Sequence, residues 1–332
     1  MSANNLRLLC IFLISTTLIT AAPAEKKVIY ITPGLWGNLF DPYYESMCQL
    51  RHILIEKGYK VEQANSIASL PDMEWLITFD LPFQELHHVQ QYPKEKCVAF
   101  LWEPPSVVPE NYNKQLHKHF SRIYTWDDRL IDNKKYFKFY YPVCFPIINT
   151  LVPFTEKKMC TFIFANKWSG HPQELYSERR KLLEYFETLP THEFDFYGRY
   201  WNPKLYKNYK GPINNKIEIL QRYKFCICYE NVYGIPGYIT EKIFDCFRAG
   251  CVPIYWGAPN INHYIPEACY IDRRRFANNQ ELYNFMKNMP EAEYNNYIHS
   301  VEQFLTSASA YRYSIPYFIE LFVNLIESTS KS

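Results

Sequence analysis

The stretch from Phe225 to Pro259 constrains the fold of this chain more than any other. It begins with a near-continuous apolar run at residues 225–229, which is typical of a strand covered on both faces of a sheet. Gly234, Pro236 and Gly237 then mark a loop. The pattern predicts a buried strand that leads through a glycine-bearing loop into a helix and a second buried strand.

The helix after this loop is predicted to start at Thr240, a good N-cap, and to end at residues 249–250. Glu241 and Lys242 then lie in its first turn. The free N–H groups and the helix dipole attract anions there, and Lys242 adds a full positive charge. A phosphate-bearing ligand explains this arrangement. The alternative is an ordinary solvated first turn, but two glycines and Tyr238 directly before the cap are unusual for a plain surface helix.

Three blocks in this stretch resemble the signature of the α-1,3/4-fucosyltransferase family, which is glycosyltransferase family 10. They are Tyr-Glu-Asn at 229–231, Gly-Tyr-Ile-Thr-Glu-Lys at 237–242 and Ala-Gly-Cys-Val-Pro-Ile-Tyr-Trp-Gly-Ala-Pro at 249–259. The resemblance covers about residues 160–275. It implies transfer of fucose from GDP-fucose and an α/β fold of the GT-B type, in which two Rossmann-like, doubly wound domains face each other across a cleft.

Size and composition agree with a two-domain globular protein. The chain has 332 residues, of which 48% are hydrophobic. Its net charge of +2 gives no electrostatic case for nucleic acid as a partner. Aromatic residues make up 18% of the chain, which suits stacking on sugars, and compositional bias of the genome explains that value equally well.

The N-terminus resembles a targeting segment, which we take as residues 1–24. Arg7 precedes an apolar run at 8–19, and small residues follow at 21–24. A cleaved signal peptide or an uncleaved signal anchor both fit. The expected location is therefore the secretory lumen or membrane, the Golgi for a eukaryotic chain, with membrane association through the N-terminus. A bacterial chain would be membrane-associated or exported. The absence of any N-x-[ST] sequon weakly opposes a glycosylated luminal protein.

Strands alternate with helices along the rest of the chain, which favours parallel sheets covered by helices. We expect an acceptor-binding domain at 25–150, a GDP-fucose-binding domain at 155–310, and a C-terminal helix at 311–332 that packs back on the first domain. A proline-rich linker is predicted at 141–156. The expected strands are 27–32, 59–61, 75–79, 97–102, 122–125, 161–164, 194–197 and 270–271, and the expected helices are 43–57, 177–187, 215–223, 279–288, 291–306 and 311–327.

Many nucleotide-sugar transferases neutralise the departing diphosphate with a divalent metal on a D-x-D motif, and this chain has none. The nearest patterns are Asp127-Asp128 and Glu193-x-Asp195. No CxxC pair occurs, which makes a structural zinc site improbable. We therefore expect no cofactor and no obligatory metal, with cations and a helix N-terminus stabilising the leaving group.

The resemblance implies a donor-binding set drawn from both halves of the second domain. Lys242 and Arg180 grip the phosphates, with Arg179 as the alternative one residue away; an amphipathic helix face with three basic residues is the plain alternative. Glu241 accepts hydrogen bonds from donor hydroxyls. The full expected set is Asn166, Arg180, Glu230, Asn231, Tyr238, Glu241 and Lys242.

A general base is expected on the first domain. Glu103 follows the predicted strand 97–102 and precedes two prolines that fix the loop. A carboxylate partly desolvated beside Trp102 has a raised pKa, which suits a base near neutral pH. The alternative is a strand-end carboxylate facing solvent.

These expectations combine into an inverting, metal-independent transfer of L-fucose from GDP-fucose to a hydroxyl of an oligosaccharide, glycoprotein or glycolipid, expected to be the 3-hydroxyl of GlcNAc or glucose. Two alternatives stay open. One is a GT-B transferase that uses a different nucleotide sugar, and the other is a carbohydrate-binding protein without catalysis. A dehydrogenase and a P-loop phosphotransferase are disfavoured, because neither G-x-G-x-x-G after a strand nor G-x-x-x-x-G-K occurs.

Overall fold

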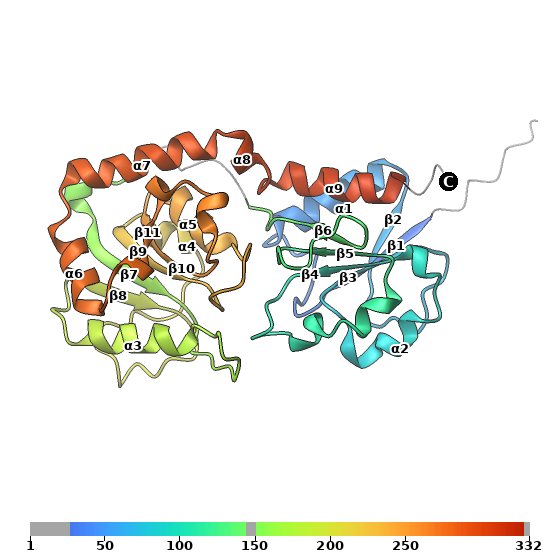
Figure 1. Ribbon diagram of the computed structural model, residues 1–332, viewed down its shortest axis with the longest axis horizontal. Coiled ribbons are helices and arrows are strands. Elements are labelled where there is room, and N and C mark those ends of the chain that lie inside the picture. Colours follow the sequence, from blue (N-terminus) through green and yellow to red (C-terminus); the bar gives the residue numbers. More distant parts are fainter. Residues whose placement is uncertain (1–26, 144–150, 329–332) are drawn as a thin grey trace, which may run out of the picture.

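A computed structural model of the protein describes residues 27–143 and 151–328. These residues form two α/β domains that lie side by side, and the last helices run along one edge of both (Figure 1). The predicted targeting segment, 1–24, lies outside the described residues, as does the central part of the predicted linker, 144–150. The expected two-domain, doubly wound architecture is confirmed.

The first domain is built on a six-stranded sheet in the order β2-β1-β3-β4-β5-β6, in which every pairing is parallel. Its elements are β1 (Val28–Thr32), α1 (Glu45–Glu56), β2 (Lys60–Gln63), β3 (Met73–Phe79), α2 (Leu86–Val89), β4 (Cys97–Leu101), β5 (Arg122–Thr125) and β6 (Tyr136–Lys138). Met47, Leu50 and Leu54 are the buried residues of α1, so its predicted apolar face is confirmed. The short edge strand β6 was not predicted, because three residues give too little alternation to detect.

The second domain has a five-stranded parallel sheet in the order β11-β10-β9-β7-β8. Its elements are β7 (Lys158–Ile163), α3 (Tyr176–Glu187), β8 (Phe194–Tyr197), α4 (Lys216–Leu220), β9 (Tyr223–Tyr229), α5 (Glu241–Arg248), β10 (Val252–Trp256), β11 (Ile271–Asp272), α6 (Asn279–Asn288), α7 (Glu291–Leu305), α8 (Ala308–Tyr311) and α9 (Ile315–Ser328). The chain leaves β7 towards β8 and then returns to β9. The crevice between β7 and β9 is thus the point where the winding direction changes, which is where open α/β sheets bind ligands.

Two predicted helices differ from the observed ones. The helix expected at 215–223 ends at Leu220, because the residues from Tyr223 onward already pair in β9. The helix expected at 311–327 is two helices, α8 and α9, separated by residues 312–314. The α9 helix packs on the first domain, where the rings of Phe322 and Phe100 stack with centroids 4.6 Å apart.

A polar cluster joins the two domains beside the cleft. Asp128 of the first domain accepts hydrogen bonds from Asn260 and Tyr264 of the second, at 2.9 and 2.6 Å. Gly237 approaches so closely that a Cβ there would lie 2.3 Å from the carbonyl oxygen of Trp126, so only glycine fits. The acidic pair noted at 127–128 therefore has structural partners, and Asp128 helps to fix the orientation of the domains.

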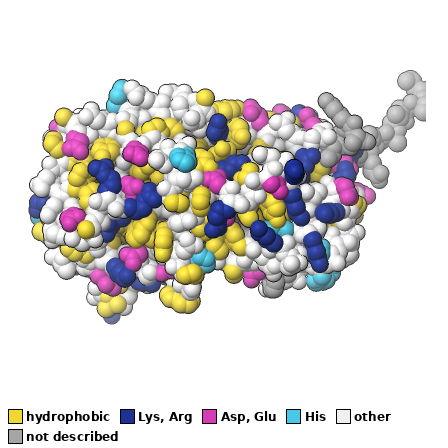
Figure 2. Space-filling model, in the orientation of Figure 1, with side chains coloured by type: hydrophobic (Ala, Val, Ile, Leu, Met, Phe, Trp, Pro, Cys, Tyr) yellow, Lys and Arg dark blue, Asp and Glu magenta, His cyan; other side chains and the backbone are white. Residues whose placement is uncertain are grey.

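The surface bears both signs of charge. On the face shown in Figure 2, Lys and Arg side chains lie on both domains together with acidic ones, in keeping with the small net charge. No helix among the described residues is both long enough and apolar enough to span a membrane.

Candidate active site

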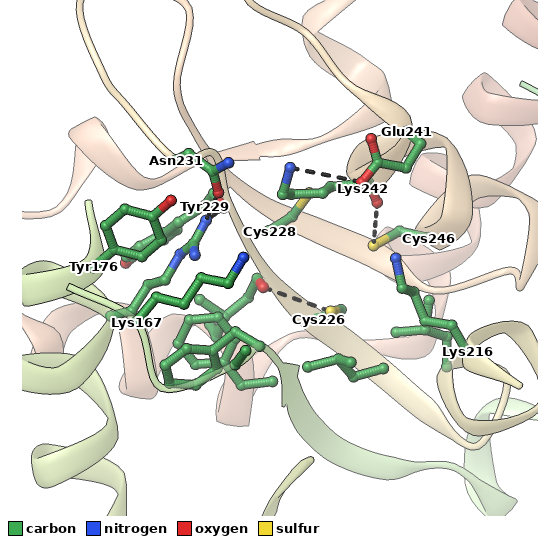
Figure 3. Close-up of a pocket in the computed structure, with 17 residues that line it drawn as sticks. Lys167, Tyr176, Lys216, Cys226, Cys228, Tyr229, Asn231, Glu241, Lys242 and Cys246 are labelled. Carbon is green, nitrogen blue, oxygen red and sulfur yellow. Dashed lines mark hydrogen bonds and ion pairs between the residues drawn. The ribbon is translucent and has the colours of Figure 1, made fainter. Parts of the chain in front are cut away.

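A pocket of about 170 Å³ opens at the crevice between β7 and β9 (Figure 3). Residues of both strands form its floor, and α3, α4 and α5 supply its walls. Four of the side chains that line it are cationic and one is a carboxylate; these are Lys167, Arg179, Lys216, Lys242 and Glu241. Such an excess of positive charge at a strand end beside a helix N-terminus is suited to an anionic ligand.

Glu230, at the end of β9, holds the pocket's central lysine in place. Its carboxylate is fully buried and accepts hydrogen bonds from the amide and hydroxyl of Thr240 and from Lys242 Nζ, the last at 3.0 Å. A Cβ at position 257 would lie 2.5 Å from Glu230 Cγ, which explains the glycine there. Glu230 lies behind the pocket and outside its lining, so it orients Lys242.

Lys242 is charged at neutral pH. Burial alone lowers its pKa, but the carboxylates of Glu230 and Glu241 outweigh that effect and raise the pKa above its usual value. Figure 3 shows the amino groups of Lys167, Lys216 and Lys242 around the same opening. Three ammonium groups from a loop and two helices therefore converge on one volume.

Of the two candidate arginines, the structure brings Arg179 into the pocket. Its side chain is 4% exposed, lies over the Tyr176 ring and donates to Asn231 Oδ1 at 3.2 Å. Its Nε has no hydrogen-bond partner among the described residues. Arg180 is not part of the lining, and its guanidinium donates to the carbonyl of Lys167 at 2.7 Å. Successive residues on a helix point about 100° apart, so only one of the two can face the pocket.

Two further predicted donor residues lie elsewhere. Asn166 is exposed, and its amide donates to the carbonyl of Tyr200 at 3.4 Å. Tyr238 is 1% exposed and packs between the domains against Trp126, with ring centroids 4.4 Å apart. Neither lines the pocket, whereas Asn231, Glu241 and Lys242 do.

Among the lining residues that sequence reasoning did not assign to the site are Lys167, Tyr176 and Lys216, whose side chains carry a charge or a hydroxyl. Lys167 directly follows Asn166, so a shift of one residue in the register of that loop would have found it. Lys216 is a charged residue in the first turn of a short helix, and no pattern in the sequence distinguishes it.

Glu103 lies two residues after the end of β4 in the first domain, outside the lining of the pocket but within electrostatic range of Lys242, Glu241 and Lys167. Loss of solvent on burial is the main reason its pKa is raised to about 7, and the charge of Asp80 adds to the rise. Lys242 and Lys167 of the second domain oppose that rise, while Glu241 adds to it. The Glu103 carboxyl is thus close enough to α5 to interact electrostatically with Lys242 and Glu241 across the cleft.

Trp102, the residue before Glu103, is held in place just after β4. The carbonyl of Trp102 accepts a hydrogen bond from the Trp126 indole at 2.9 Å and another from the Tyr141 hydroxyl. Pro104 follows directly after the carboxylate. The backbone on both sides of Glu103 is therefore restrained, as expected for a group that must meet a reacting atom.

A second cavity, of about 610 Å³, adjoins the pocket and shares residues 163–165 with it. One wall comes from the loop after β1 and the other from the ends of β7 and β8. Tyr43, on the first wall, is 78% exposed, and Arg199 lies on the second. The cleft therefore extends beyond the cationic pocket and is lined by both domains.

Within residues 27–143 and 151–328, no group of three or more His, Cys, Asp or Glu side chains is arranged to hold a metal ion. The eight cysteines of these ranges are all free thiols. Cys226 and Cys228 on the floor and Cys246 on the α5 wall line the pocket as small apolar groups.

Solved structures share this arrangement of domains. An α1,3-fucosyltransferase with GDP matches with a TM-score of 0.58 and 15% identity, covering 92% of each chain. An α-glucosyltransferase in complex with UDP matches with a TM-score of 0.53 and 11% identity, covering 90% of this chain and 98% of that one. Together with the paired doubly wound sheets, these matches show a GT-B-like fold.

Sequence comparison gives a match to one family over part of the chain. The model of glycosyltransferase family 10 (fucosyltransferase), C-terminal part, matches residues 155–315. An α-(1,3)-fucosyltransferase of Helicobacter pylori is 37% identical over 75 residues, which span 23% of this chain and 16% of that protein. The human GDP-fucose protein O-fucosyltransferase 3 is 28% identical over 116 residues, 33% of this chain and 23% of that protein. The chain thus matches less than a quarter of the length of either relative.

Proposed function

We propose that the protein is a fucosyltransferase that uses GDP-fucose as donor and inverts the anomeric carbon of fucose. The acceptor oxygen attacks C1 of β-L-fucose while Glu103 accepts the proton of the acceptor hydroxyl. The bond between C1 and the β-phosphate oxygen breaks, and GDP departs with the bonding electrons. The charge that develops on its phosphate is stabilised by Lys242, Arg179 and the N-terminus of α5.

One observation carries this proposal. The carboxyl group of Glu103, on the first domain, interacts electrostatically with Lys242 and Lys167, two of the four cations that line the pocket of the second domain. With a pKa of about 7, Glu103 is suited to exchange a proton at neutral pH. The family match and the GDP-fucose bound in a solved α1,3-fucosyltransferase of the same fold support GDP-fucose as the donor.

Binding of nucleotides tests the donor half of the proposal. Isothermal titration should give a measurable Kd for GDP, and UDP and ADP should bind much more weakly. Equal or tighter binding of UDP would favour the alternative of a different nucleotide-sugar transferase. The protein O-fucosyltransferases among the relatives make a peptide hydroxyl a second acceptor class to include in transfer assays.

We propose that the acceptor occupies the larger cavity. It adjoins the pocket and has one wall from the first domain, where Tyr43 offers an exposed ring on which the apolar face of a sugar can stack. A contact of this kind acts equally on the ground state and the transition state, so its loss raises KM and leaves kcat unchanged.

Tyr43→Ala is therefore expected to raise the acceptor KM about fivefold, from the loss of roughly 1 kcal/mol of aromatic contact. The affinity for GDP should not change. Initial rates over a range of acceptor concentrations measure the effect. Tyr311→Ala, which removes another exposed tyrosine outside the cavity, is the control. An unchanged acceptor KM in the Tyr43 variant would exclude Tyr43 from the acceptor site.

Because cationic side chains can stabilise the leaving diphosphate, transfer is expected to survive dialysis against EDTA. The measurement compares the initial rate before chelation, after chelation, and after re-addition of Mn²⁺ or Mg²⁺. A complete loss of activity that only Mn²⁺ or Mg²⁺ restores would contradict the metal-free mechanism.

A further inference from the structure

A second carboxylate lies directly behind the proposed base. Asp80 follows β3, the neighbour of β4 in the sheet, and its side chain is 4% exposed. Its Oδ1 accepts hydrogen bonds from the backbone amides of Trp102 and Glu103, both at 2.8 Å. One oxygen of Asp80 thus binds two successive amides at the point where the chain turns out of β4.

Asn111 ties the same group to the next loop. Its amide donates to Asp80 Oδ1 at 2.6 Å and to the carbonyl of Glu103 at 3.1 Å, and its own oxygen accepts from the amide of Leu81 at 2.9 Å. Asn111 is fully buried. Both the N–H and the C=O of Glu103 are therefore held by this pair of buried polar side chains.

The backbone of Asp80 is in the left-handed region, with φ at 61°. Residues other than glycine rarely adopt this conformation, and Asp and Asn tolerate it better than most. Strain of this kind persists when surrounding interactions enforce it, and it is concentrated near functional sites. Here the enforced turn aims the carboxylate at the backbone of Glu103.

We propose that Asp80 is a positioning residue that fixes Glu103 at the cleft and sets the pH at which Glu103 can act as a base. This inference rests on the proposed function, in which Glu103 deprotonates the acceptor. Asp80 lies outside the lining of both cavities and acts through Glu103.

The charges around Glu103 give the direction of the effect. Asp80 from β3 and Glu241 from α5 are negative, while Lys242 from α5 and Lys167 from the loop after β7 are positive. Burial and the charge of Asp80 are the two largest causes that raise the pKa of Glu103 to about 7. Burial likewise raises the pKa of Asp80 to about 6, so Asp80 is mainly charged where Glu103 titrates. The two groups form a coupled pair that loses its protons in successive steps.

Asp80→Asn tests this proposal. Asn keeps the acceptor oxygen for all three hydrogen bonds and tolerates the left-handed backbone, but it removes the charge. With a Glu103 pKa of about 7, kcat/KM of the parent should be about tenfold higher at pH 8 than at pH 6. Without the neighbouring charge the pKa of Glu103 falls. The acid limb of the profile, where the rate falls as Glu103 becomes protonated, then moves to lower pH, and the ratio of kcat/KM at pH 8 to that at pH 6 falls well below tenfold.

Asp72→Asn is the matched control. Asp72 directly precedes β3, whereas Asp80 directly follows it. The backbone of Asp72 is also in the left-handed region, with φ at 56°. It is exposed at the far end of the strand, roughly 26 Å from Asp80 at 3.3 Å per residue. Its pH profile should match that of the parent. An Asp80→Asn profile with a lower kcat but an unmoved acid limb would overturn the proposal and leave Asp80 a purely structural residue.

A second measurement separates this inference from the proposed function. The carboxyl ¹³C shift of Glu103, assigned with Glu103→Gln, reports its titration without any need for turnover. A midpoint that falls from about 7 in the parent to a lower pH in Asp80→Asn supports the role of Asp80 in tuning Glu103 even if no fucose is transferred. An identical midpoint in the two proteins overturns it even if fucose transfer is robust.

Discussion

Glu103→Gln is expected to lower kcat by about 10²- to 10⁴-fold, the usual contribution of a positioned general base. Gln keeps the shape of the side chain and can still hydrogen-bond, but it cannot accept the proton of the acceptor hydroxyl. The affinity for GDP should stay nearly constant, because the cations that line the donor pocket all belong to the second domain. Steady-state kinetics and GDP titration on the same preparations measure both quantities.

The pH profile provides an independent readout of the same substitution. The rate of the parent should rise with pH through about 7, because Glu103 must be deprotonated to act. In Glu103→Gln this acid limb should disappear along with most of the activity. Glu110→Gln, a carboxylate nearby on the loop after β4, should behave as the parent does. Near-normal turnover in Glu103→Gln would show that Glu103 is a structural strand-end residue, and the base would then have to be sought among other carboxylates of the first domain.

Lys242→Ala is expected to weaken GDP binding by about 1.5 to 3 kcal/mol, or roughly one to two decades in Kd. The ammonium group converges with those of Lys167 and Lys216 on the pocket, where a phosphate would receive a charge-assisted hydrogen bond. Because the substitution leaves Glu230 buried without its lysine, thermal unfolding must be measured alongside binding. Unchanged GDP affinity in a folded Lys242→Ala protein would exclude this pocket as the phosphate site.

The two neighbouring arginines provide a matched pair for the same measurement. Arg179→Met keeps the apolar part of a buried side chain and removes the guanidinium, and it should weaken GDP binding to a similar extent. Arg180→Met removes an equal charge one residue away and should leave the affinity nearly unchanged, because Arg180 lies outside the lining. The reverse result would restore the assignment of Arg180 made from the sequence.

The sequence predicted the architecture well because its strongest patterns are local. One short segment determines a strand, a loop and a helix. The apolar run at 225–229 predicts the strand, the glycines after it predict the loop, and the cap at Thr240 predicts the start of the helix. All three are present. Alternation of strands and helices then predicts parallel sheets. These features depend on nearest neighbours along the chain, which a single sequence displays directly.

The site was harder to predict, since it depends on which way side chains point after packing. Arg179 and Arg180 are indistinguishable in a basic helix face until α3 is placed on its sheet. Tyr238 stands in the signature loop, yet the contact with Trp126 of the other domain buries it. Asp80 did carry a detectable signal, a carboxylate at the carboxyl end of a predicted strand, and its importance becomes visible only with its hydrogen bonds to β4.

Transfer from a panel of sugar nucleotides to a glycan array tests the central claim most directly. The protein is incubated with GDP-fucose, GDP-mannose, UDP-glucose and UDP-GlcNAc in separate reactions, with Glu103→Gln as the matched inactive control. We predict an α-linked fucose on hydroxyl-bearing acceptors with GDP-fucose only, and none above background with the Glu103 variant. Transfer from another donor in preference to GDP-fucose, or glycan binding without transfer from any of the four donors, would contradict the account.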